Sequence, residues 1–122
     1  MLRTSRIGES TMDLNLAVLA GRLAAPPETR TLDSGERMIR YLVTTRMAEP
    51  RRRVDVVPVT VWDPPKELID VDRHPGERVW VTGTIQRRFW SEPLGRRSRL
   101  EFIADQVCFS PSESSTAPQG AS

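Results

Sequence analysis

The chain has 122 residues, which is enough for one domain with a hydrophobic core and too few for two. Its charged fraction of 28% is typical of a folded protein, and a formal charge of only +2 gives no global argument for an acidic partner. The single cysteine, Cys108, excludes an intramolecular disulfide and lies in an apolar stretch, where we expect a buried thiol. The sequence has no apolar run long enough for a membrane span or a secretion signal, so we expect a cytoplasmic protein.

The two ends of the chain are polar and lack hydrophobic periodicity. We expect residues 1–12 to form a flexible arm and residues 110–122 a disordered, low-complexity tail. Between them, residues 13–109 alternate apolar and polar side chains in short runs that are separated by glycine, proline and polar turns. That pattern is typical of β-strands and predicts one all-β domain.

The alternation predicts strands and one short helix in a fixed order. Pro58 suits an edge or an irregular point of its strand, because proline gives no ladder donor. Asp63 is expected to cap the helix, with Pro64 at its first position. The expected elements are a strand from Leu14 with a bend at Gly21, a short extended piece at 29–32, strands at 38–46 and 54–62, a helix at 63–69, and strands at 79–90 and 98–109.

Five long strands with one helix between the third and the fourth are the plan of the OB-fold, a small Greek-key barrel. This barrel commonly binds oligonucleotides or oligosaccharides. The sequence therefore predicts a five-stranded OB-fold barrel.

The strand at 79–90 carries the clearest functional signal. Its inward parity is apolar and holds Val79, Val81, Gly83 and Ile85. Its outward parity holds Trp80, Thr82, Thr84, Gln86, Arg88 and Trp90. An indole among hydroxyl and basic neighbours is poorly placed for a core and well placed to stack on a nucleobase, with arginine nearby for the phosphates. The pattern therefore predicts a nucleic-acid-binding surface.

Basic residues gather at the two expected hairpins. Lys66 is the only lysine, and every other cation is arginine. A GC-rich genome would give the same bias, although the planar guanidinium also suits phosphate and stacking. The arginines could also be solvated hairpin tips. Together with the stacking candidates Trp90 and Trp62, the residues expected to bind nucleic acid are Arg22, Arg40, Arg46, Arg51, Arg52, Arg53, Arg87, Arg88, Arg96, Arg97 and Arg99.

The aromatic residues each have a structural alternative. Trp90 could be an indole packed at a subunit contact, and the valine-rich strand around Trp62 could bury that side chain. For Trp80 we favour packing or an interface. Phe89 and Phe102 share the inward parity of their strands and are expected in the core.

Nothing in the sequence supports catalysis. His74, the only histidine, precedes a Pro-Gly turn, where we expect it at the surface. Asp70 and Asp72 lie at an expected helix end and should face water. No nucleophile triad, phosphate-binding loop or metal-ligand spacing is present, so we expect neither an enzyme nor a cofactor or metal site.

Short motifs along residues 13–109 share their order and spacing with one known family. They are Asn15-Leu-Ala-Val-Leu-Ala-Gly21-Arg22-Leu23, Pro27-Glu28-x-Arg30 with Gly35, Val59-x-Val61-Trp62, Pro75-Gly76-x-x-Val79-x-Val81-x-Gly83, and Arg87-Arg88-Phe89-Trp90 with Gly95. In these motifs the chain resembles the bacterial single-stranded DNA-binding (SSB) proteins.

The resemblance implies an OB-fold subunit that assembles as a homotetramer in the cytoplasm, at the nucleoid. It implies binding of single-stranded DNA without sequence preference, in support of DNA replication, repair and recombination. Trp90 matches a base-stacking aromatic of the fourth strand. Trp62 matches an aromatic position of the third strand, where the family usually has phenylalanine.

The chain also departs from the family pattern. Two further stacking tryptophans have no counterpart, since one falls near Glu49 and the other at Val56, and the loop between the second and third strands is shorter than usual. The sequence ends in Gln-Gly-Ala-Ser instead of the acidic, phenylalanine-ended tip that recruits partners. We therefore expect a divergent or secondary member that binds DNA more weakly and recruits no partner through such a tip.

The resulting hypothesis is non-catalytic, sequence-independent binding of single-stranded DNA by stacking and by arginine–phosphate contacts. Two alternatives remain open. One is an OB-fold module whose aromatic face meets a protein, and the other is an RNA-binding or primosome-associated OB protein.

Overall fold

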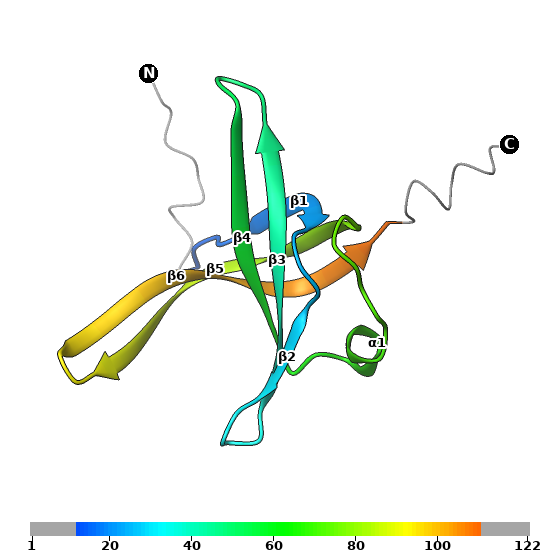
Figure 1. The fold of residues 1–122 in the computed structure, drawn as a ribbon. Coiled ribbons are helices and arrows are strands. Elements are labelled where there is room, and N and C mark those ends of the chain that lie inside the picture. The colour runs from blue at the N-terminus through cyan, green and yellow to red at the C-terminus, as the bar shows by residue number, and fades with distance from the viewer. Residues whose placement is uncertain (1–11, 111–122) are drawn as a thin grey trace, which may run out of the picture.

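Strands account for most of the residues that the structure describes. The computed structural model describes residues 12–110, so almost all of the expected arm and of the expected tail lies outside the described residues. None of the helices in this part of the chain is long and apolar enough to span a membrane. The elements of residues 12–110 are β1 (Ala17–Leu23), β2 (Glu28–Thr31), β3 (Arg37–Met47), β4 (Arg53–Trp62), α1 (Lys66–Ile69), β5 (Arg78–Glu92) and β6 (Gly95–Phe109) (Figure 1).

The strands close into a barrel. The sheet order is β1-β5-β6-β4-β3-β2, and β1 also pairs with β3, so a ring of five strands forms with β2 extending beyond β3. The contact between β4 and β6 is parallel and joins Val59 to Phe102 and Thr60 to Ile103. With α1 between β4 and β5, this architecture confirms the predicted OB-fold.

The barrel interior is filled by the apolar parity of the strands. Side chains alternate across a pleated strand, so Val79 and Val81 point inward while Trp80 between them is exposed. Burying each such aliphatic side chain contributes about 1.5–3 kcal/mol. The largest fully buried side chains are Ile39, Tyr41, Val43, Val59, Val79 and Val81.

Two glycines allow strands to approach closely at the bends of the barrel. A Cβ atom at Gly83 would collide with the carbonyl oxygen of Ile103, and one at Gly21 would collide with that of Thr44. Beside Gly83 the β5–β6 register shifts, which leaves Asp105 as one extra residue in β6. This β-bulge bends the strand and changes which parity of β6 faces inward. At Gly21, where the sequence predicts a bend, the structure shows a close approach of β1 to Thr44 that excludes a side chain.

The start of the helix was predicted wrongly. Asp63 has a positive φ of 50° and its backbone N–H donates to the carbonyl oxygen of Arg37 at 2.9 Å. It therefore extends the pairing of β4 with β3 by one residue and caps no helix. The helix begins at Lys66, after an extended Pro65, so Pro64 is not its first residue.

Two side chains lie elsewhere than expected. Cys108 is exposed, because the bulge at Asp105 turns it outward, opposite Trp80. Phe89 is also exposed, because β5 runs beyond the barrel into a hairpin with β6, where its inward parity has no core to enter. Trp80 is 52% exposed, which leaves the interface as the expected role for it. Phe102, by contrast, is buried as predicted.

Tyr41 places a phenol inside the barrel. Its side chain is fully buried, and its hydroxyl oxygen has no hydrogen-bond partner among residues 12–110. The ring meets that of Phe109 edge-on, with 5.8 Å between the centroids, and the Arg73 guanidinium lies 3.8 Å above Phe109. Burial raises the pKa of Tyr41 above its usual 10.0, and the positive charge of Arg73 opposes that rise.

Replacing Gly83 by alanine should destabilise the barrel by about 2–4 kcal/mol, because the added methyl group meets backbone that cannot rotate away. Thr82→Ala, at the adjacent half-buried outward position, is the control and should cost less than about 1 kcal/mol. Urea denaturation of both variants measures the difference. Equal stabilities would show that the two strands separate freely at this point.

Tyr41→Phe should leave the free energy of unfolding unchanged or raise it by up to about 1 kcal/mol at neutral pH, because it removes only an unpaired buried hydroxyl. The raised pKa means that the phenol ionises first in the unfolded chain, so wild-type stability should fall as the pH rises above 10.0. Tyr41→Phe should show a smaller alkaline loss in urea titrations. A clear loss of stability at neutral pH would contradict the unpaired hydroxyl.

Candidate nucleic-acid interface

Two hairpins extend from one junction of the barrel. Because β4 and β6 run parallel, their N-terminal halves leave the Val59–Phe102 contact on the same side and then diverge (Figure 1). One half continues into the β3–β4 hairpin and the other into the β5–β6 hairpin. The outer faces of both hairpins carry most of the arginines that the sequence singles out.

One tryptophan and four arginines surround a hollow of about 340 Å³ on the outer face, which we call the Trp90 hollow. Arg88 and Trp90 point to the same side of β5, and Arg99 lies opposite Arg88 in the register with β6. Arg40 comes from β3 and Arg30 from β2. Two pairs of strands that are distant in sequence, β2 with β3 and β5 with β6, therefore supply one cationic concavity around a half-buried indole.

A carboxylate sits between two of these arginines. The side chain of Glu101 is only 9% exposed, and one of its oxygens lies 3.2 Å from Arg99 Nε and 3.6 Å from Arg88 Nη1. The Arg99 guanidinium also lies 5.7 Å from the centre of the Trp90 ring, within the range of a cation–π contact. The two guanidinium groups are therefore oriented before any ligand arrives.

The indole of Trp90 is fixed at its edge. Its Nε1 donates to Glu92 Oε2 at 2.9 Å, and the other oxygen of Glu92 accepts from Arg97 Nε at 3.0 Å. Arg97 is thereby engaged at the hairpin end. These bonds hold the ring by its edge and use neither of its faces.

A second basic hollow, of about 360 Å³, lies at the end of the β3–β4 hairpin. Arg46, Arg52 and Arg53 line it, and Arg51 is exposed in the same turn. Arg53 Nε donates to Asp55 Oδ2 at 2.7 Å, and this hydrogen bond lowers the pKa of Asp55. The pair is exposed, so it adds little to stability.

The remaining predicted arginines lie elsewhere. Arg87 and Arg96 are on the opposite face of the β5–β6 hairpin, where Arg87 donates to Ser98 Oγ at 3.1 Å and Arg96 lies 4.7 Å from the Phe89 ring. Arg22 donates to the carbonyl oxygen of Gly76 at 2.9 Å and lines neither basic hollow. The predicted set is therefore divided between separate surfaces.

Trp62 and Arg30 belong to one row of the sheet. Met38 pairs with Trp62 on one side and with Arg30 on the other, so the three side chains share the outer face. Trp62 is half-buried there, beyond Arg40. The set of predicted site residues did not include Arg30, because the sequence does not reveal that the short β2 pairs with β3. The available signal was that Arg30 and Glu28, two residues apart, share one face of an extended segment.

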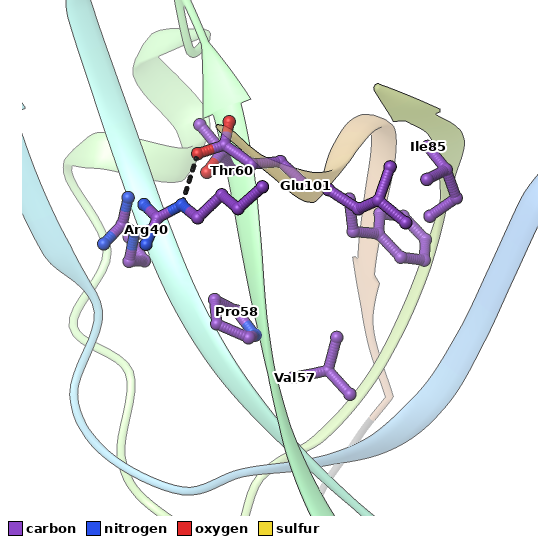
Figure 2. A pocket seen from close by; sticks show the side chains of 9 residues that line it. Arg40, Val57, Pro58, Thr60, Ile85 and Glu101 are labelled. Carbon is purple, nitrogen blue, oxygen red and sulfur yellow. Dashed lines mark hydrogen bonds and ion pairs between the residues drawn. The ribbon is translucent and has the colours of Figure 1, made fainter. Parts of the chain in front are cut away.

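An apolar pocket of about 350 Å³ lies in the fork between β4 and β6, and we call it the fork pocket (Figure 2). Arg40 and Arg99 line both this pocket and the Trp90 hollow. The dashed contact in Figure 2 joins Arg99 to Glu101. The pocket is lined by Arg40, Val57, Pro58, Thr60, Ile85, Arg99, Leu100, Glu101 and Phe102.

The closed barrel and the basic hollow around Trp90 together define a small OB-fold protein with a candidate binding surface on its outer face. The model of the Single-strand binding protein family matches residues 14–110. The chain therefore belongs to the SSB family.

Individual proteins agree with this assignment. Single-stranded DNA-binding protein 1 of Staphylococcus aureus is 30% identical over 101 residues, which cover 79% of this chain and 65% of the relative. The single-stranded DNA-binding protein of Caldanaerobacter subterraneus is 29% identical over 101 residues, covering 79% and 67% of the two chains. The match therefore spans slightly less than two thirds of the Staphylococcus protein.

A solved structure supports the fold. The Plasmodium falciparum SSB, described in complex with single-stranded DNA, superposes with a TM-score of 0.68. The two chains are 22% identical, and the match covers 84% of this chain and 99% of the other. At this identity the similarity concerns the barrel alone.

Proposed function

We propose that this protein binds single-stranded DNA without sequence preference and without catalysis, in support of DNA replication, repair and recombination. The observation that carries the proposal is the Trp90 hollow, where a half-buried indole lies among four arginines. Family membership supports it independently. The proposed location is the cytoplasm, at the nucleoid.

Stacking and charge neutralisation are the two physical contributions. A base stacked on an indole contributes about 1–3 kcal/mol, and every base has a flat face, so the contact tolerates any sequence. Arginines that neutralise phosphates release counterions, and the logarithm of the affinity should fall with the logarithm of salt by about 0.7 for each phosphate contacted. Duplex DNA should bind poorly, because its bases already stack on one another.

The contacts fall into a central and an outer group. Trp90, Arg40, Arg88 and Arg99 form the centre, with Arg30 added to the predicted set. We propose that the strand extends toward Trp62 on one side and toward the β3–β4 hairpin on the other. The outer group comprises Arg46, Arg51, Arg52 and Arg53, together with Arg97 opposite Trp90 and the more distant Arg22, Arg87 and Arg96.

We further propose that the protein assembles with itself, as a homotetramer. The outward face of β1, β5 and β6 supports this, since Ala20 pairs with Trp80 and Trp80 with Cys108 across three strands. Val18 and Trp80 there are 55% and 52% exposed. An uncovered apolar strip of this kind suits a contact between subunits.

Oligo(dT) should quench the tryptophan fluorescence of the protein, and added salt should reverse the quenching. Trp90→Ala should weaken oligo(dT) binding by about 5- to 150-fold, because a stacking contact is lost. Trp90→Phe is the matched variant and should retain most of the affinity. The thermal midpoint should move little in either variant.

Unchanged emission at micromolar oligo(dT) would contradict DNA binding and would favour a protein-interaction module. Tighter binding of oligo(U) than of oligo(dT) would favour an RNA-associated protein. If Trp90→Ala lost much thermal stability and kept its DNA affinity, the indole would be structural.

Arg88→Gln should reduce the salt slope of oligo(dT) binding by about 0.7, because one phosphate contact is lost. Arg37→Gln is the charge-matched control, since Arg37 lines a different hollow with Ser34, Gly35, Glu36 and Asp63. Its slope should stay at the wild-type value. Titrations over a range of salt concentrations measure both slopes, and equal reductions would mean that only net charge matters.

A further inference from the structure

The fork pocket exists because two parallel strands part immediately after they meet. β4 and β6 pair at residues 59–60 and 102–103, and their preceding residues then diverge. Val57 and Pro58 on one strand and Leu100 on the other line a gap of about 350 Å³. Figure 2 shows Val57 and Pro58 on β4 at this gap. Leu100 is 60% exposed, so the pocket opens to solvent. Its volume is at the small end of the range for ligand pockets.

The pocket combines an apolar lining with guanidinium groups at its edge. Val57, Pro58, Ile85, Leu100 and Phe102 supply aliphatic and aromatic carbon. Arg40 and Arg99 add hydrogen-bond donors to this lining. A ligand with a flat apolar face and an acceptor at its edge would satisfy both features. Nucleobases have this chemistry, because their edges carry carbonyl and ring-nitrogen acceptors.

The pocket and the Trp90 hollow share their charged residues. Arg40 and Arg99 line both cavities, so their guanidinium groups lie between the two. A phosphodiester held by these arginines would have one base on the side of Trp90 and a neighbouring base on the side of Leu100. A nucleic-acid strand could therefore occupy both cavities at once, with its backbone at the shared arginines.

We propose that the fork pocket is a second base site, in which one nucleobase of the bound strand packs on Leu100, Pro58 and Ile85 instead of stacking on an aromatic ring. This inference rests on the proposed function and adds to it a site without an aromatic platform. The Arg40 guanidinium donates to the edge of that base, and Arg99 holds the phosphate between the two sites. The two arginines at the pocket favour a polyanion over an apolar peptide as the occupant.

The test compares two leucines of the same hairpin. Leu100→Ala removes a wall of the pocket, whereas Leu94→Ala removes a leucine that is 93% exposed and lines no part of the pocket. Binding of oligo(dT) should weaken about fivefold in Leu100→Ala, because apolar contact area is lost. It should be unchanged in Leu94→Ala. The salt slope should stay the same in both variants, since no phosphate contact changes.

An abasic oligomer of equal length identifies what fills the pocket. This deoxyribose-phosphate chain keeps the charges and lacks the bases, so wild type and Leu100→Ala should bind it equally. A Leu100→Ala loss that persists on the abasic oligomer would overturn the proposal, since the leucine would then act on the backbone or on the hairpin conformation. Thermal midpoints of both variants control for folding.

The outcomes separate the two proposals. If wild-type protein fails to bind oligo(dT), DNA binding itself is wrong, and this inference fails with it. If wild-type protein binds and Trp90→Ala weakens binding, but Leu100→Ala equals Leu94→Ala, then only the second base site is overturned. In that case an apolar peptide side chain would be the remaining candidate occupant of the fork pocket.

Discussion

The short parallel contact between β4 and β6 determines the shape of the molecule. Two residue pairs, Val59 with Phe102 and Thr60 with Ile103, complete the ring of strands and thereby enclose the core. Because the contact is parallel, the residues that precede it in β4 and in β6 lie on the same side of the contact. There the two strands separate from each other. The barrel, the two basic hairpins and the pocket between them all follow from this one junction.

Much of the fold could be predicted from the sequence, because the barrel interior obeys a simple alternation. Val79 and Val81 are inward and Trp80 is outward, as period-2 patterning requires. The alternation no longer predicts burial where a β-bulge shifts the register or where a strand extends beyond the barrel. The bulge at Asp105 turns Cys108 outward, and beyond Gly83 the β5 strand leaves the core, so Phe89 keeps its parity and loses its burial.

The candidate site could be predicted only in part. Arg88 and Trp90 were recognisable because they lie two residues apart on one strand, where parity alone decides that they share a face. Arg30 was missed, and Arg87 was grouped with its neighbour Arg88 although it points the other way. Pairing between distant strands and the face of each arginine are tertiary properties that residue type does not encode. The fork pocket has no sequence motif at all, since it is the space left by two diverging strands.

Glu101 gives the cationic surface an anion of its own. Its carboxylate already occupies Arg88 and Arg99, so an arriving phosphate meets guanidinium groups whose strongest partner is internal. Under the proposed function, each phosphate would compete with that partner, which lowers the net gain of binding and leaves the arginines paired again once the strand departs. A strand bound in this way would be released readily. A carboxylate held among the arginines favours such easy release over permanent attachment.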